Sequence, residues 1–61
     1  MSLTPKTVLV VDDSESIRES IGHHLKREFR VLRAPTGEAA LATLGRDEVD
    51  LVLMNAQLSG I

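Results

Sequence analysis

The stretch Thr7-Val8-Leu9-Val10-Val11-Asp12-Asp13-Ser14 decides the fold of this chain. Its first five residues are β-branched or apolar, and two aspartates follow them directly. Continuous rather than alternating hydrophobicity predicts a short strand that is buried on both faces, as in a parallel sheet. The chain is therefore expected to pair this strand with others through helical crossovers.

A helix is predicted to follow the aspartates. Ile17, Ile21 and Leu25 recur at steps of four in a polar background, which is typical of one apolar stripe on a helix of about three turns. Ser14 and Ser16 are both candidates to cap its start. We expect the stripe to lie in the core.

Two further strands and a second helix complete the pattern. Residues 30–34 are predicted to form a strand whose two arginines suit the edge of a sheet. Thr36 is expected to cap a helix over residues 37–44, and Gly45 to end it in a left-handed conformation. Residues 51–54 are another continuous apolar run and the third strand. Two leucines of the second helix are assigned to the core: Leu41 and Leu44.

Connection rules turn this order into a topology. Parallel strands that are joined by helices cross over right-handedly, so pairing of the first strand with both others gives the order 2-1-3, with one helix on each face. The chain then reverses direction between the first and third strands, which leaves a crevice at their carboxyl ends. Asp12, Asp13 and Asn55 are predicted to point into this crevice.

The adjacent carboxylates point to a divalent cation. Two such groups repel one another unless a cation or solvent compensates them, and Mg²⁺ accepts one or two carboxylates together with several waters. Alternatively, Asp12 and Asp13 only cap the following helix and favour its positive end. The doublet alone does not separate these interpretations, but the placement of Asn55 opposite it favours the metal.

Composition excludes several other classes. The chain has 61 residues, 43% of them hydrophobic, no cysteine and a formal charge of −2, so disulfides are ruled out and nothing attracts a phosphate backbone. Phe29 is the only aromatic residue, which argues against base stacking on single-stranded nucleic acid. Apolar runs are too short for a membrane span or secretory signal. We expect a soluble, cytoplasmic chain that contacts neither nucleic acid nor membrane.

Three motifs in the right order resemble the receiver domain of two-component response regulators. They are residues 8–14, 34–41 and 50–54, which together extend over nearly the whole chain. The resemblance implies a flavodoxin-like doubly wound α/β sheet that is truncated after the third strand. Residues 1–6 are then a flexible tail, and residues 7–61 a partial receiver domain.

The same resemblance assigns roles to the predicted crevice. In the family, the acidic pair after the first strand holds Mg²⁺, which here means Asp12 and Asp13. An aspartate after the third strand accepts a phosphoryl group from a histidine kinase or phosphotransfer protein, but this chain has Asn55 there. A neutral carboxamide is a poor nucleophile, so we expect no aspartyl phosphorylation and only weak metal ligation by Asn55. A natural pseudo-receiver, an engineered block and deamidation back to aspartate all fit Asn55.

Several further expectations follow from the resemblance. The later strand-helix units, with their phosphoryl-contacting Ser or Thr and Lys, lie beyond residue 61, so the third strand is expected to offer an unpaired edge for self-association. Ser14, Glu15 and Arg18 are candidate kinase contacts. Arg18 is within reach of the acidic crevice one turn away, but a solvent-exposed position on the helix is the favoured interpretation. The adjacent histidines 23 and 24 point about 100° apart on a helix and are expected to be solvated.

Two rival functions remain open. A phosphohydrolase with an aspartate nucleophile after the first strand would resemble the haloacid-dehalogenase-like enzymes, which have aspartates two residues apart. Asp12-Asp13-Ser14-Glu15 lacks that spacing. The other rival is an interaction module that uses the receiver shape without phosphate, which Asn55 favours. We expect a signalling module and no enzyme.

Overall fold

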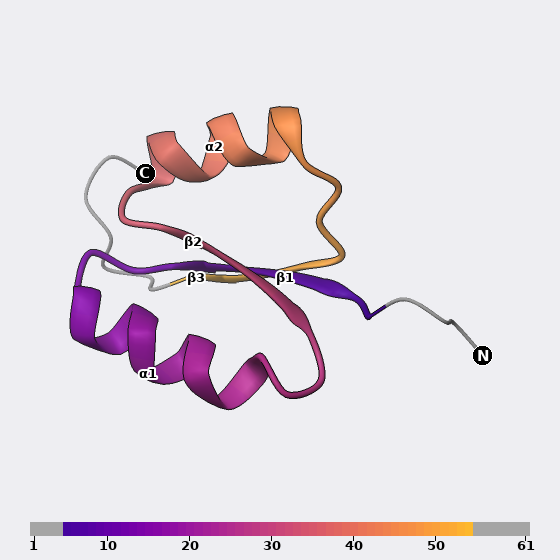
Figure 1. Ribbon diagram of the computed structural model, residues 1–61. Coiled ribbons are helices and arrows are strands. Elements are labelled where there is room, and N and C mark those ends of the chain that lie inside the picture. The colour runs from indigo at the N-terminus through magenta and orange to yellow at the C-terminus, as the bar shows by residue number, and fades with distance from the viewer. Residues whose placement is uncertain (1–4, 55–61) are drawn as a thin grey trace.

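The computed structural model describes residues 5–54 of the chain, which form a three-layer α/β arrangement. The elements are β1 (Thr7–Val11), α1 (Glu15–Leu25), β2 (Arg30–Ala34), α2 (Gly37–Arg46) and β3 (Leu51–Met54). The strands form one parallel sheet in the order β2-β1-β3, as predicted. Figure 1 shows α1 on one face of the sheet and α2 on the other. Neither helix of this described part is long and apolar enough to cross a membrane.

The central strand β1 is buried throughout. Its apolar residues Val8–Val11 are at most 1% exposed, because strands pair with both of its edges and a helix covers each face. Register runs from Thr7 opposite Arg30 to Val11 opposite Ala34 on one side, and from Val8 opposite Leu51 on the other. The unbroken apolar pattern of β1 is thus explained by burial on two faces.

Side-chain caps fix the start of each helix. The Ser14 hydroxyl accepts a hydrogen bond from the amide of Ile17 at 3.4 Å, so Ser14 rather than Ser16 begins α1. The Thr36 hydroxyl accepts from the amide of Ala39 at 3.0 Å and begins α2 as predicted. These bonds satisfy backbone donors that have no partner inside the helix.

The prediction that Gly45 ends α2 is wrong. Gly45 lies inside the helix, which continues to Arg46, and its backbone is not left-handed. The amide of Asp47 donates to the carbonyl of Thr43 at 2.8 Å, and Asp47 itself is extended. Because Asp47 completes the last helical hydrogen bond, the chain leaves the helix without a glycine terminator.

The buried core lies mainly between the sheet and α2. Leu9, Val11, Ala34 and Ala40 form a fully buried cluster. Four partly buried residues pack against this cluster: Leu32, Ala39, Val49 and Val52. The small side chains of α2 let the helix approach the strands closely, which accounts for the alanine-rich sequence of this helix.

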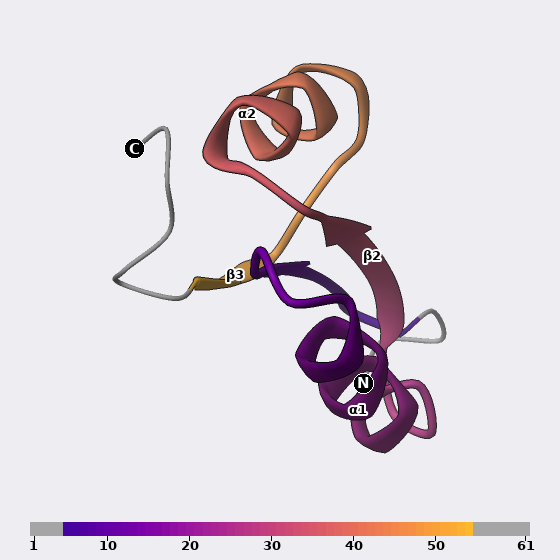
Figure 2. The ribbon, with the colours of Figure 1, turned by 90° about the vertical axis from the view of Figure 1, so that its left-hand side faces the viewer.

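The predicted core positions on both helices are corrected by the structure. Ile17 is 46% exposed, Leu41 71% and Leu44 43%, whereas Ile21 and Leu25 are half-buried. Both helices lie over β1 and β2 rather than over β3. The turned view in Figure 2 shows β3 at the side of the sheet opposite β2.

Asp50 sets the position of β3 against β1. Its carboxylate Oδ2 accepts a hydrogen bond from the amide of Thr7 at 2.7 Å, and its own amide donates to the carbonyl of Thr7 at 2.9 Å. Thr7 is only 7% exposed, so its amide has little access to replacement water. Asp50 thus joins the starts of the two strands and fixes their register.

Asp50→Ala is expected to lower the free energy of unfolding by about 1–2 kcal/mol, since the Thr7 amide loses a charged acceptor. Asp50→Asn should cost less because its amide oxygen can still accept. Urea denaturation followed by circular dichroism measures both. Asp47→Ala is the control with the same charge change: the Asp47 carboxylate pairs with the exposed Arg46 side chain at 3.2 Å, and a change below about 0.5 kcal/mol is expected. Equal losses in Asp50→Ala and Asp47→Ala would contradict the role of Asp50.

The two edges of the sheet differ in chemistry. β2 carries the exposed Arg30 and Arg33, which confirms its predicted edge position and discourages pairing with another chain. β3 is uncharged, and its residues Leu51, Leu53 and Met54 are 52%, 37% and 47% exposed. Among residues 5–54 no strand pairs with its outer edge.

We predict that the 61-residue chain self-associates through β3 and that Leu51→Lys weakens this association, because a charge on the strand opposes pairing. Sedimentation equilibrium over a concentration series measures the change. Leu41→Lys, on the exposed side of α2, is the control and should leave association intact. A monomer at every concentration, or equal effects of the two substitutions, would show that the edge of β3 is not the contact.

Candidate metal site at the carboxyl ends of β1 and β3

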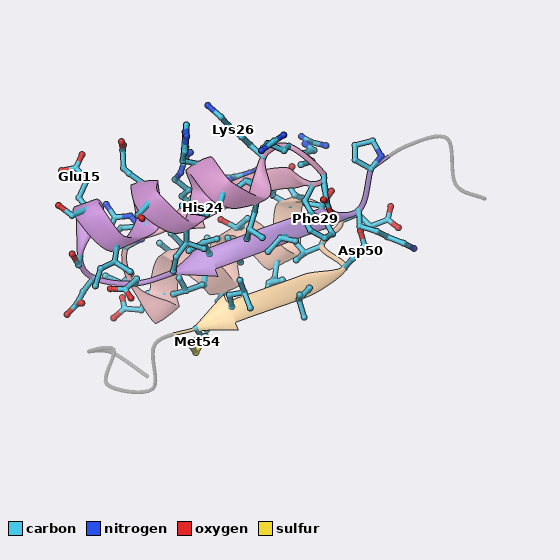
Figure 3. The ribbon with its side chains drawn as sticks, turned by 90° about the horizontal axis from the view of Figure 1, so that it is seen from below. Glu15, His24, Lys26, Phe29, Asp50 and Met54 are labelled. Atoms are coloured by element: carbon cyan, nitrogen blue, oxygen red, sulfur yellow. The ribbon has the colours of Figure 1, made fainter. Side chains whose placement is uncertain are left out.

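The carboxyl ends of β1 and β3 lie side by side. Val11 is opposite Met54 in the parallel register, and Asp12 and Asp13 follow Val11 directly. Figure 3 shows Glu15, the first residue of α1, and Met54, the last of β3, at the same end of the molecule. Asn55 is next in the sequence but lies outside the described residues. The acidic pair is thus found at the switch point where parallel α/β sheets carry their sites.

Asp12 is held by hydrogen bonds on several sides. Its amide donates to the carbonyl of Ala34 at 3.2 Å, and its carboxylate Oδ1 accepts from the amide of Ser14 at 2.9 Å. Its own carbonyl accepts from Nη1 of Arg18 at 2.7 Å. The residue is only 6% exposed. Asp12 is therefore a fixed group at the end of the central strand.

Asp13 has a different environment. Its side chain is exposed, in contrast to that of Asp12. A solvated side chain without fixed partners reorients readily when a cation arrives. The pair thus combines one oriented oxygen donor with one adaptable donor.

The donor set fits a hard divalent cation. Among residues 5–54 no group of three or more His, Cys, Asp or Glu side chains is gathered to hold a metal. Two carboxylates with waters meet the needs of Mg²⁺, which seldom takes a dedicated cage of protein ligands, whereas a structural zinc site needs four nitrogen or sulfur donors. Asp12 and Asp13 are the residues that would hold Mg²⁺.

An apolar cavity lies beside Asp12 on the α1 side of the sheet. It has a volume of about 330 Å³. Its lining comprises Val10, Val11, Asp12, Ile21, Leu53 and Met54. Asp12 is the only charged residue of this lining, and the other lining residues are apolar.

Arg18 departs from its predicted position in solvent. The residue is half-buried and reaches back over the first turn of α1 to the carbonyl of Asp12. The position of Arg18 in the first turns of a helix is the sequence signal for this contact. Side chains on a helix lean toward its N-terminus, and Asp12 lies one turn away in that direction. The spacing alone does not separate it from an ordinary surface arginine.

Of the other residues singled out in the sequence, one caps α1 and the others are exposed to solvent. Ser14 is half-buried and its hydroxyl caps α1, while Glu15 is exposed in the first turn. His23 and His24 are exposed as predicted, with ring planes 78° apart, and Nδ1 of His24 lies 3.0 Å from the carbonyl of Ser20. Contact of the α1 start with a kinase stays a prediction.

Comparison with known proteins identifies the class of this α/β chain. The family model of the response regulator receiver domain matches residues 8–61. The chemotaxis response regulator CheY4 of Vibrio cholerae superposes with a TM-score of 0.90 at 32% sequence identity over 95% of this chain and 49% of that chain. This chain therefore belongs to the response regulator receiver domain family, with the two-component signalling role and the CheY-like fold of that family.

Two bacterial regulators are similar over the full chain. The hydrogenase transcriptional regulatory protein HoxA of Cupriavidus necator is 36% identical over 61 residues, which is 13% of its length. The transcriptional activator protein PfeR of Pseudomonas aeruginosa is 34% identical over 62 residues, or 20% of its length. The chain thus spans a small part of these relatives and about half of CheY4.

Proposed function

We propose that this chain is the metal-binding part of a receiver domain, with Mg²⁺ bound by Asp12 and Asp13 and no phosphoryl acceptor at position 55. The observation that carries the proposal is the nearly buried Asp12, oriented by hydrogen bonds at the end of β1 and followed by the solvated Asp13. A Mg²⁺ ion held by these two carboxylates would supply positive charge that stabilises phosphoryl oxygens. The described residues support the binding half of this chemistry.

The sequence at position 55 removes the nucleophile. An acyl phosphate forms when a carboxylate oxygen attacks phosphorus and the donor's leaving group departs with its electron pair. Asn55 presents a neutral carboxamide in place of that oxygen. We propose that a histidine kinase or phosphotransfer protein docks on this chain without transferring a phosphoryl group to it, in the cytoplasm, and that the chain catalyses no turnover.

The second candidate is a phosphate-independent interaction module. Asn55 favours it, and so does the exposed Glu15 beside the half-buried Ser14 at the start of α1, where the resemblance places kinase contacts. Metal binding separates the two candidates, because a pure interaction module has no need of the acidic pair. Phosphohydrolase activity is disfavoured because Asp12 and Asp13 are adjacent rather than two residues apart. Turnover of a phosphomonoester would be evidence for such an enzyme.

Magnesium titration followed by amide NMR shifts tests the metal site. We expect Asn55→Asp to bind Mg²⁺ more tightly than the unaltered chain, since a third negative charge joins the site. Asp13→Asn should weaken binding, and Asp47→Asn, which removes a charge on the exposed end of α2, should not. Equal affinities in the unaltered chain and Asn55→Asp would exclude position 55 from the site.

Incubation with acetyl phosphate tests the missing nucleophile. The intact mass of material verified as Asn55 should not change, because a carboxamide does not form an acyl phosphate under these conditions. Mass spectrometry before incubation controls for deamidation to aspartate. A phosphate adduct that maps to residue 55 in verified Asn55 material would refute the proposal.

A further inference from the structure

The carbonyl of Asp12 belongs to the first residue after β1. The register of β1 ends at Val11, which is opposite Ala34 on one side and Met54 on the other. Asp12 is only 6% exposed, so a carbonyl without a protein partner there would carry a desolvation cost. Arg18 supplies the donor through Nη1 at 2.7 Å, the short distance that is typical of a charge-assisted bond.

Arg18 is anchored at both of its ends. Its amide donates to the carbonyl of Ser14 at 3.0 Å, which places its backbone in the first turn of α1. Its side chain then crosses that turn toward the N-terminus of the helix and meets Asp12. Arg18 thus bonds the carbonyls of both Asp12 and Ser14, the residues on either side of Asp13.

The same turn orients the carboxylate of Asp12. Oδ1 of Asp12 accepts from the amide of Ser14, so rotation of the Asp12 backbone moves both the carboxylate and its partner. The contact with Arg18 is made on the main chain, and its loss frees the turn itself rather than one side-chain rotamer. Outer partners of this kind set how well a metal ligand is oriented.

We propose that Arg18 is a positioning residue for the divalent cation: it holds the carbonyl of Asp12, and with it the carboxylate pair, in the orientation that binds Mg²⁺. The inference rests on the proposed function, since it concerns the same metal site. The proposal predicts that removal of the Arg18 side chain weakens Mg²⁺ binding. A positive charge that acted only by repulsion would weaken Mg²⁺ binding, and its removal would tighten it, whereas loss of a positioning contact weakens binding.

Arg18→Met tests the proposal with Arg27→Met as its control, because Arg27 is exposed beyond the end of α1 and loses the same charge. In the metal-free chain, hydrogen exchange of the Ser14 amide should be faster in Arg18→Met than in Arg27→Met. In a Mg²⁺ titration, Arg18→Met should bind about tenfold more weakly, near the lower end of what loss of an outer partner costs a metal site. Unchanged Ser14 exchange, or equal or tighter Mg²⁺ binding, would overturn the proposal.

Circular dichroism shows whether Arg18→Met folds. The variants Arg18→Lys and Arg27→Lys provide a second test that keeps the net charge of the chain unchanged. Lysine lacks the planar guanidinium, so Arg18→Lys should bind Mg²⁺ at an affinity between those of the unaltered chain and Arg18→Met. Arg27→Lys should match the unaltered chain. If Arg18→Met does not fold, equal affinities in the two lysine variants would overturn the proposal.

The two readouts separate this inference from the proposed function. If the unaltered chain fails to bind Mg²⁺, the proposed function is wrong and so is the role of Arg18 toward the metal, whatever the exchange data show. If the unaltered chain binds Mg²⁺ but Arg18→Met matches it, the function stands and Arg18 is not a positioning residue.

Discussion

Burial of β1 on both faces and pairing on both of its edges is the constraint on which the rest of the structure depends. Each fully buried side chain of Val8–Val11 contributes roughly 1.5–3 kcal/mol relative to exposure, which outweighs any other local term in so short a chain. Two-sided burial requires a helix on each face, and right-handed crossovers then place β2 and β3 on opposite edges. The position of the acidic pair follows from this arrangement, because the residue after the central strand has to emerge between two diverging loops.

Width of the sheet limits what the helices can bury. α1 and α2 both contact β1 and β2 but not β3, so each helix of the described segment packs on a surface two strands wide. Neighbouring positions on a helix point about 100° apart, so Leu41 is 71% exposed while Ala40, its neighbour in sequence, is 2% exposed. Receiver domains such as CheY4 are about twice the length of this chain.

Sequence predicted the fold well where one physical signal dominates. The continuous apolar run at 7–11 and the charged strand at 30–34 defined the centre and edge of the sheet, since burial and edge chemistry act within each strand. Prediction failed for Leu41 and Leu44, because helix periodicity says which side is apolar but not how wide a surface it meets. It also failed for Gly45, where the backbone bond of Asp47 extended the helix.

The candidate site shows the same division. Its location came from sequence, through topology and the acidic pair, whereas the contacts of Asp12 with Ser14 and Arg18 required the structure. These contacts are nevertheless local, since they join residues that are at most six positions apart. The amide of Asp12 also donates to the carbonyl of Ala34 in β2, so the turn combines these local contacts with one hydrogen bond from the sheet. In the proposed site, two of the metal ligands thus belong to the turn between β1 and α1, whereas phosphoryl acceptance would need a carboxylate at position 55.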